Sequence, residues 1–349
     1  MSETLLDYAI NTIPDPLQAS PSTGNPNLAS LVLVVSNSSG DIIPCQSITL
    51  SFRVGTNAED FCSDPTGISS TTPTGWSVAQ QGGQFTYTPQ TPKNGQIGGD
   101  GLTIELAAIK VNQQPGTAFL EIIEVASDLN ALPPAPEQAR SLSLPLSKFP
   151  SEFSLGEFSA NPAIVDAGCS TILAWSGSGS SGNYTALYKI EYVDADGNKV
   201  TISHPKDEPT QPLPPIGNYT VDKLEANPTT FYLIVTVQVP GLNNPLLYTR
   251  ALPVTVIQPK PVINSFSIAA NLIIPGQNLS FTLTWDVANV NDFQVLANDG
   301  PNGQSRRLDV PFSLKGSYAV YPHQLQTIYT LELLSGKQPD LEEAAACEA

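Results

Sequence analysis

Histidine is almost missing from this 349-residue chain, which contains only His204 and His323. The two residues lie far apart and each stands beside a proline, so the sequence predicts surface or loop positions rather than a catalytic base. The sequence has no Cys-x-x-Cys pair and no Cys/His cluster of the kind that binds zinc. It also lacks the Gly-x-x-x-x-Gly-Lys-Ser/Thr segment of a phosphate-binding loop. We therefore predict no catalytic, cofactor-binding or metal-binding residue, and we predict that the chain is not an enzyme.

Basic residues are scarce as well. The chain has 15 Lys and Arg against 32 Asp and Glu, which gives a formal charge of −17. Affinity for nucleic acid comes mainly from Lys and Arg on phosphates, so a nucleic-acid partner is not expected. The acidic balance also argues against binding to anionic membrane surfaces. The charge serves solubility, or alternatively it attracts cations or a basic partner.

Long apolar segments are absent. No run of about 18 apolar residues is present, so membrane insertion is not expected. Met1–Thr12 has neither the basic start nor the apolar core of a secretory signal. The localisation stays unknown, and the expectation is a protein that remains in the cytoplasm or is exported by a non-classical route.

The four cysteines are too few for a disulfide-based scaffold. Cys45 and Cys62 share the N-terminal part of the chain and can pair only if their strands meet. Cys169 has no partner within its own part of the sequence, and Cys347 lies in the C-terminal tail. Free thiols are the expected state for most of them.

Proline and glycine are abundant, with 32 and 25 residues. They interrupt every window of about 15 residues that could carry a helical apolar period, so an all-β protein of many short strands is predicted. Ser47–Val54 alternates apolar and polar residues as a half-buried strand does. Leu102–Val111 and Thr117–Val125 flank a loop with Pro and Gly, and we predict that they form a hairpin.

One pattern occurs twice, which is typical of repeated structural units. The first copy has Phe158, Gly168, Leu173-x-Trp175, Gly217-x-Tyr219 and Thr229-Thr230-Phe231-Tyr232. The second copy has Phe266, Gly276, Leu283-x-Trp285, Gly316-x-Tyr318 and Thr327-Ile328-Tyr329. The spacings in the two copies differ by even numbers, as strands require, because only a change of two residues keeps a side chain on the same face of a sheet.

With these residues the chain resembles bacterial immunoglobulin-like (Ig-like) repeats over residues of about 151–336. The resemblance implies tandem Ig-like β-sandwich modules, which are mostly spacers, adhesin stalks or recognition modules. It transfers a fold and no activity. Trp175 and Trp285 each follow Leu-x on an alternating strand, so core positions are predicted for them. The alternative for both rings is a sugar-stacking surface.

The predicted organisation has four parts: an N-terminal β-sandwich with an extended first segment (1–149), two Ig-like modules (150–258 and 259–336) and an acidic tail (337–349). Short proline-containing junctions separate the modules, at Pro145–Pro150 and Gln258–Pro261. Linkers of this kind restrict motion, so we expect a semi-rigid rod.

Three further segments contain residue types that could carry chemistry. Asp194–Asn198 resembles the start of a calcium loop, but it lacks the later Glu and is interpreted as a hairpin turn. Glu59, Asp60 and Asp64 surround Cys62 and are interpreted as solvated loop charges. Gly177–Gly182 matches part of the Gly-x-Ser-x-Gly sequence of a nucleophile elbow. It lies between two predicted strands and is interpreted as a Ser/Gly loop.

The favoured function is a non-catalytic binding or spacer protein that recognises or positions a partner. One alternative is a structural subunit of a bacterial filament, appendage or injection-type assembly, and another is a carbohydrate-binding accessory protein. A protein partner or self-assembly is expected, and carbohydrate is possible. We expect the partner contacts within residues 1–149, at the loops Asp60–Gly75 and Pro89–Gly101 and at the apolar segment Leu5–Asn27.

Overall fold

The chain folds entirely into strands and loops within the described residues. The computed structural model contains 25 strands and no helix there, which confirms the all-β prediction. No helix that could cross a membrane occurs in this part of the chain. The described residues are 4–128, 135–205, 211–270, 280–290, 292–299, 305–321 and 327–334.

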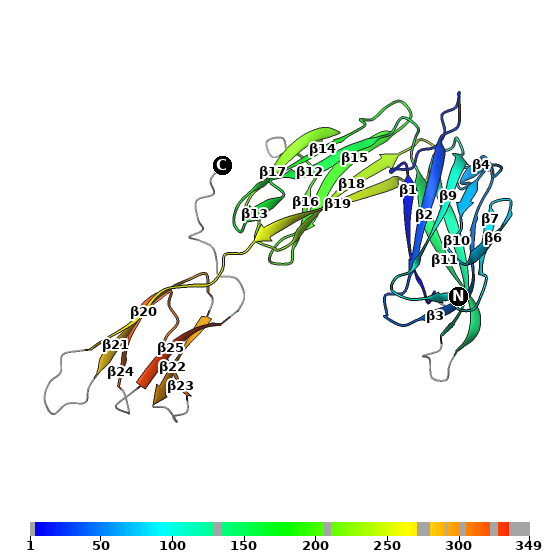
Figure 1. Ribbon diagram of the computed structural model, residues 1–349. Helices are drawn as coiled ribbons and strands as arrows, with labels where there is room; N and C mark the ends of the chain where they lie inside the picture. The colour runs from blue at the N-terminus through cyan, green and yellow to red at the C-terminus, as the bar shows by residue number, and fades with distance from the viewer. Residues whose placement is uncertain are drawn as a thin grey trace.

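The sheets form three groups that follow one another along the chain, and they are compatible with β-sandwich modules (Figure 1). Each group has its own cluster of buried apolar side chains. The strands of the first group lie within residues 7–148, those of the second within 155–257 and those of the third within 262–334.

The first group has two sheets. One has the order β1 (Asp7–Ile13), β2 (Leu28–Ser36), β9 (Leu102–Val111) and β4 (Cys62–Asp64), with β5 (Ser69–Thr71) also on β9. The other has the order β11 (Ala135–Lys148), β10 (Gly116–Asp128), β3 (Ile43–Phe52), β7 (Gln84–Pro89) and β6 (Trp76–Gln81), with β8 (Gln96–Ile97) on β3.

The predicted alternation on β3 is confirmed. Ile48, Leu50 and Phe52 are all buried, whereas Val54, which the alternation placed on the same face, is 41% exposed. The strand ends at Phe52, so the period of two no longer fixes the direction of Val54.

The predicted hairpin between Leu102–Val111 and Thr117–Val125 is wrong. β9 pairs with β2, β4 and β5, whereas β10 pairs with β3 and β11, so the loop between them crosses from one sheet to the other. Local apolar patterns specify which face of a strand is buried, but they do not specify which neighbour it pairs with. Asn112, directly after β9, is buried at the start of this loop, and its side chain is hydrogen-bonded there.

The N-terminal segment is covered by its own chain. β1 pairs with β2, Leu6 is buried in the first core, and Leu5, Tyr8 and Ile10 pack against it. The buried carboxylate of Glu124 on β10 accepts hydrogen bonds from the backbone N–H of Leu5 at 2.5 Å and from the hydroxyl of Tyr8 at 2.8 Å. Most of the apolar residues that motivated docking of this segment on another molecule therefore already have their cover, and only Ile13 among them is exposed, at 58%.

The second group also has two sheets. The smaller has the order β12 (Leu155–Asn161), β14 (Thr171–Gly177) and β17 (Ile216–Val221). The larger has the order β13 (Ile164–Asp166), β19 (Leu246–Ile257), β18 (Thr229–Gln238), β15 (Thr185–Val193) and β16 (Lys199–Ile202). β13 and β19 run parallel, while the other pairs are antiparallel.

The third group has two described sheets of three strands. One has the order β20 (Val262–Ala270), β21 (Phe281–Ala288) and β24 (Lys315–Val320). The other has the order β23 (Ser305–Leu308), β22 (Asp292–Asp299) and β25 (Thr327–Leu334). An extended segment that includes residues 258–261 joins this group to β19 (Figure 1).

The two tryptophans of the doubled pattern are buried, as predicted, and each is 3% exposed. They have the same environment in the two groups. Trp175 lies between Phe158 and Gly217 on the neighbouring strands. The indole N–H of Trp175 donates to the carbonyl of Pro214 at 2.8 Å.

Trp285 lies in the same way between Phe266 and Gly316. Its indole N–H donates to the carbonyl of Ser313 at 2.7 Å. In both groups the indole therefore buries its ring while its N–H keeps a hydrogen-bond partner.

The doubled glycine makes room for the indole ring. A Cβ added at Gly217 would lie 2.8 Å from Cζ2 of Trp175, and one added at Gly316 would collide with the ring of Trp285. The Gly-x-Tyr and Leu-x-Trp motifs of the sequence are thus two sides of one cross-strand contact, because a ring can lie flat over a strand only where no side chain stands beneath it.

We expect Gly217→Ala to lower the free energy of unfolding by about 1–3 kcal/mol, because the methyl group overpacks the site beneath Trp175. Urea unfolding followed by tryptophan fluorescence measures the change. Gly179→Ala is the matched control, since its methyl group would meet Pro215 at an ordinary 3.6 Å. Equal stabilities for the two variants would contradict this account of the glycine.

Candidate functional site

The junction between the first and second groups contains a connected set of polar contacts. It begins at Lys148, the last residue of β11, whose side chain is fully buried. Its amine donates to Oδ1 of Asn112 at 2.6 Å and, by a short contact, to the backbone carbonyl of Asp60. A buried ammonium group costs several kcal/mol unless polar groups surround it, so this cluster holds Lys148 in place.

Asn112 occupies the centre of the cluster. Its Nδ2 donates to the backbone carbonyls of Asn57 at 2.7 Å and Asp60 at 2.8 Å. Its backbone carbonyl accepts a hydrogen bond from Ser20 at 2.9 Å. One side chain therefore fastens the loop before β4 to the crossing between the two sheets.

Burial also changes the acidity of the lysine. Desolvation lowers the pKa of Lys148 to about 8, and the negative charges of Asp60 and Glu59 oppose this shift. Asp60 is itself buried, and its carboxylate accepts the backbone N–H of Asn57 at 2.9 Å. The interpretation of Asp60 as a solvated loop charge is therefore wrong, because the loop folds back onto the first group of strands.

Phe149 continues from Lys148 into the second core. Its backbone N–H donates to Leu17 at 2.8 Å and its carbonyl accepts from Ala19 at 2.7 Å, so the N-terminal segment pairs with it. Its ring stacks on that of Phe153 at a centroid distance of 5.0 Å. The side chain of Gln18 donates to the carbonyl of Phe153 at 2.7 Å. The first segment of the chain thus contacts both groups.

A second set of contacts involves β19. The Tyr248 hydroxyl donates to Asp15 at 2.6 Å, and Nη2 of Arg250 donates to the same hydroxyl at 3.1 Å. The Arg250 guanidinium also lies 5.6 Å from the centre of the Tyr248 ring and 3.9 Å from Asp15. Burial and the carboxylate of Asp15 raise the pKa of Tyr248 to about 12. These three side chains fasten the N-terminal segment to the second group.

Two hollows of about 450 and 460 Å³ flank this junction and are lined from both groups. Both volumes fall in the usual range of small-ligand sites, which is about 300–1,000 Å³. The first is lined mainly by Thr12, Asp15, Pro16, Phe149 and Tyr248. The second is lined mainly by Ser22, Gln113, Glu152, Asn183 and Pro240.

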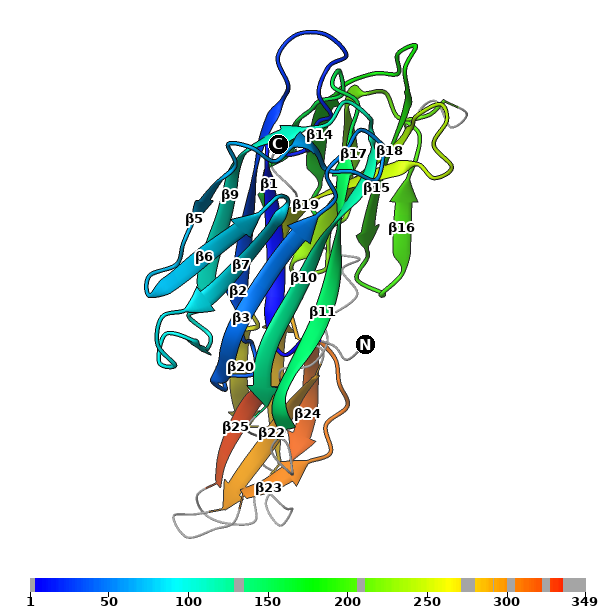
Figure 2. The same cartoon turned by 90° about the vertical axis from the view of Figure 1, so that its right-hand side faces the viewer.

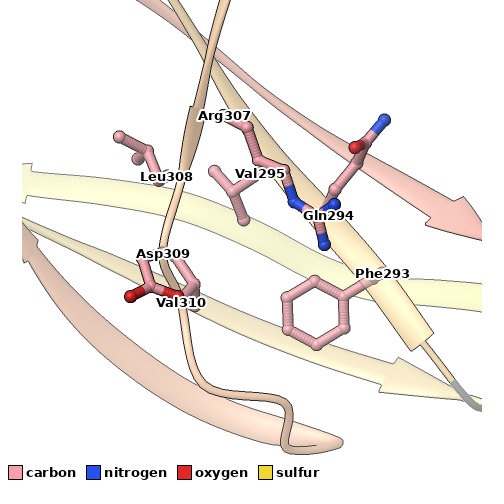
Figure 3. Close-up of a pocket in the computed structure, with 7 residues that line it drawn as sticks. All are labelled: Phe293, Gln294, Val295, Arg307, Leu308, Asp309 and Val310. Atoms are coloured by element: carbon pink, nitrogen blue, oxygen red, sulfur yellow. The ribbon is translucent and has the colours of Figure 1, made fainter.

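A smaller hollow of about 180 Å³ lies in the third group (Figure 3). Arg307 reaches from β23 toward Phe293 and Gln294 on β22. The rest of the lining consists of Val295, Leu308, Asp309 and Val310. Its volume is below the range of typical ligand pockets. We take the junction as the candidate site, because its two hollows are lined by residues of both groups.

The hairpin interpretation of Asp194–Asn198 is confirmed, since the segment joins the paired strands β15 and β16. Oδ1 of Asp194 accepts the backbone N–H of Asn198 at 2.7 Å and of Asp196 at 3.1 Å. The carboxylate therefore closes the turn. No group of three His, Cys, Asp or Glu residues suited to a metal ion occurs in the described residues.

The other candidates lie apart from the junction or take part in loop structure. Asp64 pairs with Lys110 at 2.7 Å, and Glu59 lies 3.9 Å from Arg53. His204 contacts the carbonyl of the adjacent proline at 3.2 Å. In the Gly177–Gly182 loop, the carbonyl of Ser178 accepts the Tyr188 hydroxyl at 2.7 Å.

His323 and the tail 337–349, which includes Cys347, lie outside the described residues.

The cysteines differ from the expectation in one respect. Cys45 and Cys62 are free and buried, on β3 and β4 of opposite sheets. Cys169 is disulfide-bonded, so the free thiol that was expected for most of the cysteines is not found there. Pairing depends on distance in space, which spacing along the sequence does not reveal.

Comparisons with known proteins do not show which family the chain belongs to. No family model matches it, and no curated protein matches it. Among solved structures, it is similar to a DUF4785 family protein from Legionella pneumophila, with 14% identity, a TM-score of 0.27, and coverage of 96% of this chain and 82% of that chain. It is also similar to the class 5 fimbriae chaperone CfaA, with 14% identity, a TM-score of 0.20, and coverage of 70% and 99%. Similarities this weak carry no argument about function.

We expect Cys45 and Cys62 to resist iodoacetamide at pH 8 in the native protein. Burial raises the pKa of the Cys45 thiol to about 12 and that of Cys62 to about 11, so neither forms the reactive thiolate at this pH. Mass spectrometry after timed alkylation measures the reaction, and the same protein in urea is the control. Rapid labelling of either cysteine under native conditions would show that this core opens readily.

Tyr248→Phe removes the hydroxyl that joins Asp15 and Arg250, and we expect it to cost about 1 kcal/mol of unfolding free energy. The pKa of Tyr248 is higher in the folded protein than its ordinary value of 10.0. Its contribution is therefore fully present below pH 10 and is lost as the pH rises from 10 toward 12. The difference between the native chain and the variant should shrink over that range.

Urea titrations at several pH values provide this measurement. Tyr232→Phe on the neighbouring strand β18 is the control, because Tyr232 is 42% exposed. Equal effects of the two substitutions would show that the Tyr248 hydroxyl contributes nothing to the junction.

Proposed function

We propose that the chain is a non-catalytic binding or spacer protein built from Ig-like modules, in which the first two modules form one rigid unit that positions a partner. The contact of the N-terminal segment with both modules carries this proposal. Leu17 and Ala19 pair with Phe149, and Asp15 binds Tyr248 of β19. A linker alone would let the two modules rotate, whereas a second connection made of packed rings and hydrogen bonds restricts them.

The Ig-like part of the proposal is supported by the sheet order of the second group. Two sheets of three and five strands enclose one core within about 100 residues, which is the size and layout of Ig-type sandwiches. The third group repeats the order of its smaller sheet, β20–β21–β24 for β12–β14–β17. The corresponding Trp, Phe and Gly contacts in the two groups support a tandem arrangement.

A protein partner suits the junction best. Both hollows are lined by residues of the two modules. A ligand bound there would contact both modules, so its binding would depend on their relative placement. Their polar lining is mostly Ser, Asn, Gln and Thr, which offer hydrogen bonds without strong charge. The carbohydrate alternative loses its first candidates, because the rings of Trp175 and Trp285 are buried.

The structural-subunit alternative is favoured by one observation. β11 is a 14-residue strand at the edge of its sheet, where another chain could add a strand (Figure 2). Pro145 lies within it and lacks the N–H that a continuous ladder needs. Sedimentation of the full chain at increasing concentration tests this alternative.

Deleting residues 1–27 is not a usable test of partner binding. The deletion would remove β1 together with Leu6, Leu17 and Ala19, all of which are buried. A loss of binding would then report unfolding of the first module. Substitutions at the junction in the full chain are more informative.

The rigid unit predicts a narrow distance distribution between spin labels in the first two modules. Ser77→Cys on β6 and Asp196→Cys in the turn after β15 are exposed labelling sites, and Cys45 and Cys62 are buried. We expect the distribution measured by double electron–electron resonance to broaden when Tyr248→Ala and Arg250→Ala are combined. The reason is that these substitutions remove the contacts to Asp15.

The pair Asp196→Cys and Ser305→Cys, across the second junction, is the internal comparison. If the distribution across the first junction is already broad before any junction substitution, the rigid-unit proposal is wrong.

A further inference from the structure

The buried amine of Lys148 lies against a side-chain amide. Lys148 ends β11 in one sheet of the first group, and Asn112 follows β9 in the other sheet. The amine nitrogen is 2.6 Å from Oδ1 of Asn112, so it lies beside the carbonyl carbon of the same amide. Two groups that can react are thus held together where water is excluded, which is the main requirement for an efficient intramolecular reaction.

The chemical state of both groups suits such a reaction. Only a neutral amine is a nucleophile, and burial lowers the pKa of Lys148 to about 8, so a sizeable fraction is neutral near that pH. The carbonyls of Asn57 and Asp60 accept both hydrogens of the Asn112 amide nitrogen and fix its orientation. The negative charge of Asp60 acts on the lysine nitrogen and favours the positive charge that this atom acquires during attack.

We propose that Lys148 and Asn112 form an intramolecular amide cross-link. Nζ of Lys148 attacks Cγ of Asn112 and a new C–N bond forms. The bond between Cγ and Nδ2 breaks, a proton passes from Nζ to Nδ2, and Nδ2 leaves as ammonia. No oxidant, metal or cofactor is needed, because one amide is exchanged for another.

The position of this cross-link gives it a mechanical consequence. It would join the two sheets of the first sandwich covalently at the residue that precedes Phe149 and the second group. A force applied along the chain enters the first sandwich through β11, so the bond would carry the force to β9 without separating the sheets. This inference is independent of the proposed function, since a cross-linked sandwich need not be a spacer.

The intact mass of the purified full chain tests whether the cross-link is present. We expect it to be lower than the sequence mass by one ammonia, after allowance for any disulfide. Tryptic digestion of the denatured protein should fail to cleave after Lys148, and it should give one branched peptide that contains Lys148 and Asn112. This peptide distinguishes the cross-link from loss of ammonia elsewhere.

Two variants sharpen the test. Lys148→Arg should have its full sequence mass, whereas the control Lys110→Arg, at a partly exposed lysine paired with Asp64, should still lose one ammonia. Asn112→Asp would have to lose water instead of ammonia. Its cross-linked product is then the same molecule as the cross-linked native chain, so the two masses should coincide.

A native chain with the full sequence mass, normal cleavage after Lys148 and a free amine there would overturn the proposal. Lys148 would then be a buried lysine held only by hydrogen bonds. Because this result comes from the native chain, it does not depend on whether any variant folds. The spin-label distances test the proposed function separately.

Discussion

The structure depends on the constraint that each strand buries alternate side chains against a facing sheet. This constraint places Ile48 and Leu50 of β3 in the first core and Trp175 and Trp285 in the second and third. Large rings fit only where the neighbouring strand of the same sheet offers space, which Gly217 and Gly316 provide. Because apolar burial supplies most of the stability, the position of every loop and junction follows from how these layers are filled.

The same constraint explains why the buried charged groups of the first group of strands matter. Glu124 and Lys148 both occupy inward positions of their strands. Each is on the same face as the buried residue two positions earlier, Ile122 or Leu146. An inward charge is tolerated only with partners, so Glu124 binds the N-terminal strand and Lys148 binds Asn112. Each charged side chain thereby fixes a segment that the apolar core alone would leave loosely attached.

The junction combines both effects. Phe149 and Phe153 contribute apolar contacts. The hydrogen bonds among Asp15, Tyr248 and Arg250 fix the orientation of the N-terminal segment on the second group. The N-terminal segment crosses from the first core to this set, so one stretch of chain contributes to the folding of the first group and to its attachment to the second. The third group has a different connection, through the segment that includes residues 258–261.

Sequence alone determined the all-β class, the alternation of β3, the turn at Asp194–Asn198 and the burial of both tryptophans, since these follow from local period and turn chemistry. It also contained a signal that we missed, because Lys148 continues the inward series Leu142, Leu144 and Leu146. Only the tertiary structure decided that β9 and β10 belong to opposite sheets, that the N-terminal segment packs on its own chain, and that Lys148 meets Asn112. These outcomes depend on contacts between residues far apart in the sequence, and local patterns carry no information about such partners.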